Sequence, residues 1–307
     1  MDKYGLKMLL RSIRSSLGRY LAILAIVALG VGFFAGLKSS QPAMQSTVDE
    51  YMRDNRMVDF QLMSSLGLTE SDRAAFAQLD GVKYAEGAYG VDAMAAVGKT
   101  EEPYRFMSVT ENVSVPLLVA GRMPETDGEC LADAGAFSEK DIGKTVQLSE
   151  DNDADTLDMF TSRSYKIVGI AKSPRYISND RGSTSLGSGS LKGFIILPAA
   201  AFNSEVYHEI LLYCNFDGAL FSSEYDTARD KLKPRIQQLL NRCGARRYET
   251  LRAETNAKLA DAQLEINDGW DEYYANESSA LSQINDGLAQ IEAAESEIEQ
   301  NRAALDD

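Results

Sequence analysis

Histidine and cysteine are scarce in this chain of 307 residues: it has one histidine, His208, and three widely spaced cysteines. A single histidine excludes zinc sites built from several histidines and leaves little to activate a nucleophile. His208 lies inside a strand-like run, which is typical of a structural or surface residue. We therefore expect a non-catalytic protein without catalytic, cofactor-binding or metal-binding residues.

The cysteines, Cys130, Cys214 and Cys243, form no CxxC pair and are odd in number. This spacing predicts neither a metal site nor a disulfide framework. We interpret the three side chains as small buried hydrophobic groups, with a bridge between Cys214 and Cys243 as the alternative.

Charge is absent from residues 20–37, which read YLAILAIVALGVGFFAGL. About 20 apolar residues in a helix cross the hydrocarbon layer of a bilayer. The nineteen residues before this run carry five basic side chains and one acid, Asp2, whereas the rest of the chain holds 26 bases and 45 acids. By the positive-inside rule, residues 1–19 form a basic cytoplasmic segment, residues 20–37 a transmembrane helix in the plasma membrane, and the residues after Leu37 are extracytoplasmic.

Two alternatives for this run are a cleaved signal peptide and a buried core helix. A signal peptide has a shorter apolar core, and residues 38–42, KSSQP, are a poor cleavage context. The one-sided basic flank argues against a core helix. The acidic balance of the whole chain, 46 acids against 31 bases, argues against nucleic-acid binding, which needs a basic surface.

The segments after the apolar run predict an α+β domain. Residues 41–53 read as a helix that continues outward, and a strand, helix and strand follow, with an N-cap at Thr69 and Asp72 three positions later. The pattern of strand, helix and strand recurs at residues 208–216, 222–242 and 245–250. We therefore predict an α/β core from residues 38–114 and 199–250, split by a β-rich subdomain at residues 115–198, in which residues 151–158 are a hairpin tip or a solvated loop.

The last segment, residues 251–307, is predicted to be a long coiled-coil helix. Residues 249–307 contain no proline and hold 15 acids against three bases. Apolar side chains recur there at alternating steps of three and four residues, which is the pattern of a coiled-coil seam. A disordered acidic tail is the alternative. The seam positions are Leu281, Ile284, Leu288, Ile291, Glu295, Ile298, Arg302 and Leu305.

Two stretches of the middle region carry a family resemblance. The first is Ala120-Gly-Arg-Met-Pro124 followed by Gly128-Glu-Cys-Leu131, and the second contains Ser173-Pro-Arg-Tyr-Ile177 and Arg181-Gly-Ser-Thr-Ser-Leu-Gly187. Their order resembles the extracytoplasmic core domain of FtsX-like, MacB-type ABC transporter permeases, and most resembles the long Gram-positive members with a coiled-coil insertion. The resemblance covers the whole chain, which corresponds to the N-terminal part of such a permease.

The glycines of these stretches indicate turns rather than chemistry. Gly121 and Pro124 set a turn, and Gly182, Gly187, Gly189 and Gly193 form a loop that can adopt positive φ angles. The GxxxxGK[ST] phosphate-binding pattern is absent. We therefore expect a structural or partner-contact loop and not a ligand site.

The resemblance implies a membrane subunit that couples a cytoplasmic ATPase to an extracytoplasmic domain and coiled coil. Its expected partners are a separate ABC ATPase subunit, the remainder of the permease, a second copy in a homodimer, and an extracytoplasmic protein on the coiled coil. The implied role is export of lipid, lipoprotein or peptide, or control of a cell-wall enzyme. Alternatives are a periplasmic-adaptor-like efflux protein and the extracellular sensor domain of a membrane receptor.

Overall fold

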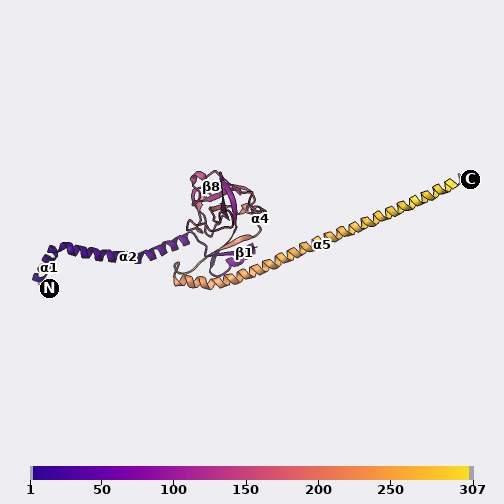
Figure 1. The fold of residues 1–307 in the computed structure, drawn as a ribbon. Helices are drawn as coiled ribbons and strands as arrows, with labels where there is room; N and C mark the ends of the chain where they lie inside the picture. The colour runs from indigo at the N-terminus through magenta and orange to yellow at the C-terminus, as the bar shows by residue number, and fades with distance from the viewer. Residues whose placement is uncertain (1–2, 304–307) are drawn as a thin grey trace. The chain divides into compact units, whose positions relative to one another are not determined.

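The computed structural model describes residues 3–303, so the predictions that involve Asp2 and Leu305 lie outside the described part of the chain. The fold is α+β, with an apolar helix near the N-terminus and a long helix at the C-terminal end (Figure 1). The chain forms two compact units, one through Gly244 and one from Ala245.

The N-terminal part contains two helices, α1 (Lys3–Ser15) and α2 (Leu17–Asp54). α2 joins the apolar run and the expected outward helix into one element, with Pro42 inside it. Within the described residues it is the one helix long and apolar enough to cross a membrane, and none of the side chains in its apolar stretch is buried against the rest of the chain. Ile26, Leu29 and Phe33 are each more than 70% exposed, which fits a lipid-facing helix.

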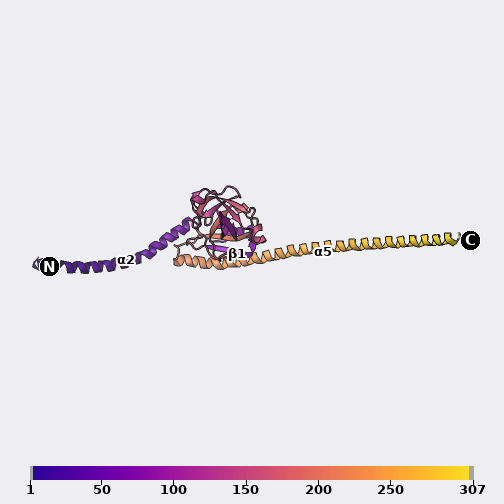
Figure 2. The same ribbon diagram turned by 45° about the horizontal axis from the view of Figure 1, so that its top comes forward.

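A three-stranded antiparallel sheet follows α2. It consists of β1 (Phe60–Leu68), β2 (Val82–Ala88) and β10 (Tyr207–Cys214), in the order β1-β10-β2. Between β1 and β2, α3 (Glu70–Ala77) begins at Thr69, which forms the predicted capping box with Asp72. The first turns of α5 (Ser223–Ala303) run beside this sheet in both views (Figures 1 and 2), where Leu232 and Ile236 are buried in its apolar cluster.

A second sheet contains the other seven strands in the order β5-β8-β6-β9-β4-β3-β7. β7 pairs with β3 on one side and with β8 on the other, so the sheet closes into a barrel, and β5 flanks β8. β3 and β4, which the sequence-based division assigned to the α/β core, belong to this sheet. The strands are β3 (Gly90–Val97), β4 (Thr100–Ser108), β5 (Leu117–Gly121), β6 (Glu129–Asp133), β7 (Thr145–Leu148), β8 (Ser164–Lys172) and β9 (Gly193–Leu197).

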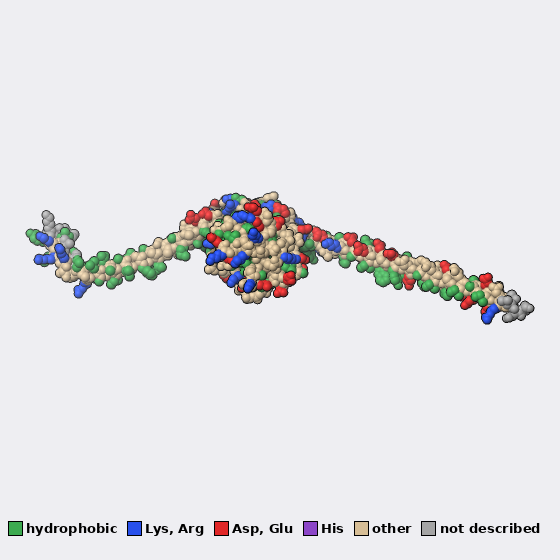
Figure 3. All heavy atoms as spheres, turned by 90° about the horizontal axis from the view of Figure 1, so that it is seen from above, with side chains coloured by type: hydrophobic (Ala, Val, Ile, Leu, Met, Phe, Trp, Pro, Cys, Tyr) green, Lys and Arg blue, Asp and Glu red, His purple; other side chains and the backbone are tan. Residues whose placement is uncertain are grey.

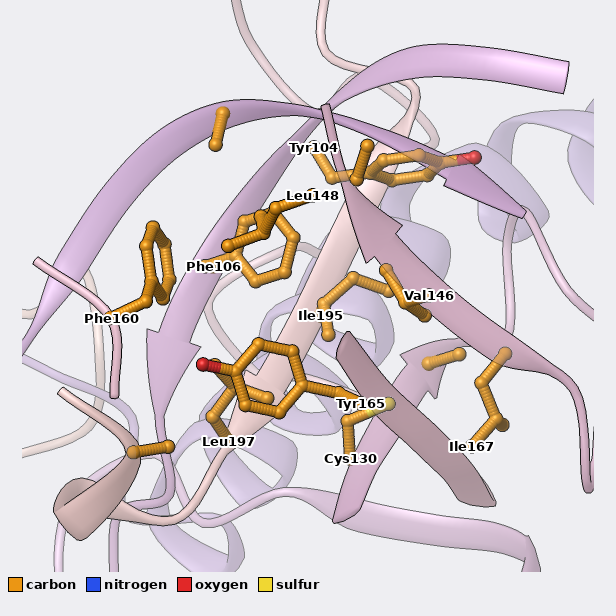
Figure 4. Close-up of a cluster of buried hydrophobic side chains, with 14 of the residues drawn as sticks. Tyr104, Phe106, Cys130, Val146, Leu148, Phe160, Tyr165, Ile167, Ile195 and Leu197 are labelled. Carbon is orange, nitrogen blue, oxygen red and sulfur yellow. The ribbon is translucent and has the colours of Figure 1, made fainter. Parts of the chain in front are cut away.

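The barrel interior is filled by alternate side chains of its strands, as the two-residue repeat of a strand requires (Figure 4). Tyr104 and Phe106 come from β4, and Tyr165 and Ile167 come from β8. Phe160 packs edge-on to Phe106, with the ring centroids 5.2 Å apart. The interior is therefore a packed core and not a channel.

Short helices connect the strands: η1 (Glu139–Asp141), α4 (Ala154–Asp158) and η2 (Ala199–Ala201). The four-aspartate stretch at residues 151–158, predicted to be a hairpin tip or a solvated loop, contains α4. Asp153 caps this helix by accepting a hydrogen bond of 2.6 Å from the backbone N–H of Thr156. Aspartate at an N-cap favours a helix start, which explains the difference.

The predicted strand at residues 245–250 is wrong, because α5 is continuous from Ser223 to Ala303. Thr250 donates its hydroxyl to the carbonyl of Arg246 four residues earlier, as helical threonines do. Gly244 alone does not end the helix, since the segment after it is rich in alanine, arginine and glutamate, which favour helix. The second predicted unit of strand, helix and strand is therefore a strand followed by one long helix.

Candidate functional site

The end of α2 is bonded to the loop that precedes α5. Asp49 Oδ1 accepts a hydrogen bond of 2.7 Å from the backbone N–H of Leu220, and Arg53 donates to the carbonyl of Gly218. Asp49 and Arg53 lie one helical turn apart and form an ion pair of 3.0 Å. Two adjacent turns of α2 thus bind residues 218–220, one through a backbone N–H and the other through a backbone carbonyl.

Asp59 extends this junction to β10 and α5. Its carboxylate accepts one hydrogen bond of 2.7 Å from the backbone N–H of Cys214 and another of 2.7 Å from the hydroxyl of Tyr225. Burial raises the pKa of Asp59, and the two hydrogen bonds act against that rise. Tyr225 also packs edge-on to Phe216, with centroids 5.1 Å apart.

Little empty space remains among these groups. The cavity between Asp49, Asp59, Tyr225 and their neighbours measures about 30 Å³, room for little more than one water molecule. We call the contacts of Asp49, Arg53 and Asp59 with residues 214–225 the helix junction. Because it is tightly packed, the helix junction fixes the end of α2 against the start of α5.

A second set of contacts joins the barrel to the three-stranded sheet. Arg175 binds Glu209 of β10 in a bidentate ion pair with distances of 2.6 and 2.8 Å, and Gln61 of β1 donates to the same carboxylate. The side chains of Arg175 and Glu209 are 13% and 6% exposed. This ion pair therefore links the two sheets at a place where water screens it weakly.

Arg181 fixes the same loop on the barrel. It pairs with Asp133 at the end of β6, with one N–O distance of 2.9 Å, and the two side chains are 9% and 1% exposed. Its guanidinium lies 5.4 Å from the ring centroid of Tyr176 and 5.6 Å from that of Phe194. These contacts hold residues 173–192 over the outer face of the barrel, so the second stretch of the family resemblance is an anchoring loop.

The predicted positive φ angles are found at three of the four glycines of this loop. Gly182, Gly187 and Gly189 have φ angles of +96°, +51° and +84°. Gly193 does not adopt a positive φ, and it begins β9 instead. A Cβ there would lie 3.0 Å from the Cβ of Ala136 and 3.3 Å from Asp133 Oδ2, so close packing beside the ion pair requires glycine at this position.

The Gly-Arg-Met-Pro stretch, predicted to set a turn, is an irregular connection at the end of β5, and the hydrogen-bonded turn follows at residues 126–129, where the N–H of Glu129 donates to the carbonyl of Thr126. Gly121 has a φ of +81°. Arg122 is bonded to Glu129 at the start of β6, and the hydrogen bond from Arg122 lowers the pKa of Glu129 to about 2. This connection therefore joins β5 to β6 and carries no catalytic arrangement.

A groove of about 620 Å³ lies between the anchoring loop and the end of α2. Thr47, Val48 and Tyr51 of α2 form one side, and Tyr176 and Ile177 form the other. Ile177 is 65% exposed. The loop is thus anchored through its arginines and open to solvent on its apolar side.

Comparison with known proteins gives no family assignment for this chain. No family model and no curated protein matches the chain. One similar solved structure is the periplasmic region of MacB from Actinobacillus actinomycetemcomitans, with 14% identity, a TM-score of 0.33 and coverage of 57% of this chain and 76% of that one. Another is the extracellular domain of the noncanonic ABC-type transporter YknZ from Gram-positive bacteria, with 13% identity, a TM-score of 0.32 and coverage of 54% and 80%.

The helix junction was not predicted from the sequence. Asp49 and Asp59 bind residues more than 150 positions away, and such pairing leaves no local pattern. One signal was available at Asp59, which stands between Val58 and Phe60 at the start of a strand. An acidic side chain in that position indicates a specific partner.

His208 lies between the two sheets. Its Nδ1 lies 3.2 Å from the backbone nitrogen and 3.1 Å from the carbonyl oxygen of Gly90, and its ring packs edge-on to Tyr89 with centroids 5.6 Å apart. Burial lowers the pKa of His208. The structure places it as a neutral structural residue, in agreement with the sequence analysis.

The lowered pKa of His208 predicts a pH dependence of stability. Below its ordinary value of 6.5 the unfolded chain binds the histidine proton more readily than the folded chain, so the free energy of unfolding falls as the pH decreases through that value. Urea unfolding at pH 7.5 and pH 5.5 measures this fall. We expect His208→Asn, whose side-chain oxygen can accept from Gly90, to reduce it, and an equal fall in the variant would contradict the assignment.

The cysteines are buried within apolar clusters. Cys130 lies in the barrel interior, and Cys214 and Cys243 lie in the cluster under the three-stranded sheet without a disulfide between them. Burial raises the pKa of the Cys130 and Cys214 thiols. Both therefore stay protonated and unreactive at neutral pH.

Proposed function

We propose that this chain is the first membrane helix and extracytoplasmic part of an FtsX-like ABC transporter permease. In this proposal α2 crosses the plasma membrane with α1 on the cytoplasmic side and both sheets outside. The observation that supports it best is the continuity of α2, which runs from the apolar segment into the helix junction at the start of α5.

The proposed role is mechanical. A helix of 38 residues is about 57 Å long, enough to cross the bilayer and reach the sheets beyond it. ATP binding by a separate cytoplasmic ATPase subunit moves the membrane helices of the permease. α2 carries that movement to Asp49, Arg53 and Asp59, whose partners lie in β10 and at the start of α5.

The chain itself supplies no catalytic step in this proposal, and the remaining membrane helices belong to the rest of the permease. A homodimer and an extracytoplasmic partner on α5 complete the assembly. The proposed classes of activity are export of lipid, lipoprotein or peptide and control of a cell-wall enzyme.

The experiment follows movement of α5 in the full-length permease copurified with its ATPase subunit. A fluorophore on a cysteine introduced at Leu288 reports ATP-dependent change. We expect the change to be lost when Asp49 and Arg53 are both replaced by alanine, because these substitutions remove the bonds between α2 and residues 218–220.

The matched control is Asp54→Ala, which removes an exposed acidic side chain from the same end of α2. It is expected to leave the ATP-dependent change intact. Absence of ATPase association would overturn the proposed function, whereas association with an undiminished signal in the Asp49 and Arg53 variant would overturn the role of the helix junction.

A further inference from the structure

The short helix α1 carries positive charge that no neighbouring residue balances. Its 13 residues hold no acid and four bases, Lys3, Lys7, Arg11 and Arg14. Arg19 adds a fifth base in the first turn of α2, and the next acidic residue after it is Asp49. Figure 3 shows basic and hydrophobic side chains gathered at this end of the chain, at the left of the view. The bases of α1 therefore have no acidic partner within residues 3–48.

Basic and apolar residues separate around the axis of α1. Basic residues recur at positions 3, 7, 11 and 14, and apolar residues recur at positions 6, 9, 10 and 13. With 3.6 residues per turn, each set occupies an arc of about 100°, and the two arcs lie side by side. Leu6 and Leu9 of the apolar arc are 49% and 59% exposed. α1 thus presents exposed apolar surface beside a row of bases.

α1 is joined directly to the helix that crosses the membrane in the proposed function. Only Ser16 separates it from α2, which begins at Leu17. Ser16 has a ψ angle of 29°, against about −42° in an α-helix, so the two helices are not one continuous rod. The apolar run begins at Tyr20, about 6 Å of helix beyond Ser16. α1 therefore lies close to the lipid headgroups where α2 enters the bilayer.

We propose that α1 lies in the plane of the bilayer surface and binds the anionic headgroups of phospholipids. Its apolar arc enters the boundary between headgroups and acyl chains, while Lys7, Arg11 and Arg14 extend sideways to the phosphates. An anionic bilayer surface covers the apolar arc and also balances the charge of the bases. A nucleic acid would balance the charge but leave the apolar arc in water. This inference rests on the membrane crossing of α2 in the proposed function and does not depend on the ATPase subunit.

The first experiment measures the depth of α1 in vesicles of phosphatidylcholine and phosphatidylglycerol that contain the full chain. A fluorophore is attached to a cysteine introduced at Leu6 or at Ser15, which lie about 180° apart around the helix. The three native cysteines are buried and do not compete for the label. Quenching by lipids spin-labelled at defined depths is expected to place the Leu6 probe deeper than the Ser15 probe. A helix that projects into water reverses this order, because Ser15 is nearer to the membrane segment, and the reversed order would overturn the proposal.

The second experiment measures the preference of α1 for anionic lipid. The Leu6 probe is quenched by phosphatidylglycerol or by phosphatidylcholine, each carrying the same quencher on its headgroup. We expect phosphatidylglycerol to be preferred by about fivefold or more, and the preference to fall at high salt because the charges are screened. Replacing Lys7, Arg11 and Arg14 together by glutamine is expected to reduce the preference to about twofold or less. An undiminished preference in this variant would overturn the proposal.

The matched control replaces three exposed bases of α5 by glutamine: Lys231, Lys233 and Arg235. It removes the same charge from the chain and is expected to leave the lipid preference unchanged, so an equal loss in both variants would overturn the proposal. A probe at Leu29 that is quenched from the bilayer centre shows that α2 crosses the membrane. Without that quenching, the membrane crossing in the proposed function fails and this inference fails with it. Quenching at Leu29 without an anionic preference at α1 overturns this inference alone.

Discussion

Replacing Arg181 with methionine is expected to lower the free energy of unfolding of the two-sheet domain by about 3–5 kcal/mol. The substitution leaves the carboxylate of Asp133, which is 1% exposed, buried without its charged partner. It also removes the guanidinium from the faces of Tyr176 and Phe194, which costs further stabilisation. Urea unfolding followed by near-ultraviolet circular dichroism of the tyrosines measures the loss.

Two controls make this expectation specific to the buried pair. Arg122→Met removes an arginine from a surface ion pair with Glu129 and is expected to cost far less stability than Arg181→Met, since Arg122 is 46% exposed and solvent screens the pair. Combining Arg181→Met with Asp133→Leu removes the stranded charge and is expected to recover most of the loss. An Arg181→Met variant no less stable than Arg122→Met would show that the buried pair does not hold the loop.

The second large effect is expected at Gly121, where alanine should cost about 3 kcal/mol. The residue has a φ of +81°, which strains any side chain. A Cβ there would also press against the backbone carbonyl of Val168 and lie 2.8 Å from the Cα of Gly169. Because these contacts are backbone atoms of β8, the strand itself has to move.

Gly98→Ala is the matched control for Gly121→Ala. Gly98 has a comparable φ of +68°, but a Cβ there has no neighbour within 4 Å. It should therefore cost only the backbone strain, about 1–2 kcal/mol. The same denaturation experiment compares the two, and equal losses would mean that the close approach of β5 to β8 contributes nothing.

The local elements of this fold could be predicted from the sequence, but the closure of the barrel could not. The capping box of Thr69 and Asp72 and the apolar run of α2 each depend only on residues that are close together in the sequence. The barrel depends on β7 pairing with both β3 and β8, and nothing in the four residues of β7 specifies two partners. The error at residues 245–250 has a local origin, because a segment of six residues is too short for its periodicity to separate a strand from a continuing helix.

The candidate site shows the same contrast between local features, which the sequence predicts, and long-range contacts, which it does not. Arg175 and Arg181 belong to a stretch that the sequence singled out as structural, and the structure gives them defined partners in Glu209 and Asp133. Their partners could not be named in advance, since each lies at least 34 positions away. Pairings of this kind follow from the packing of whole elements and not from any motif.

The closure of the seven-stranded sheet also affects how the protein avoids unwanted association. A sheet edge presents unpaired backbone groups on which a strand of another molecule can add, and closure removes that template from six of the seven strands. β5 keeps an open side, but it is five residues long, its register with β8 is interrupted between Leu118 and Ala120, and it ends at Gly121. A short and irregular edge is a poor template, so the barrel is protected against the edge-to-edge growth that leads to aggregates.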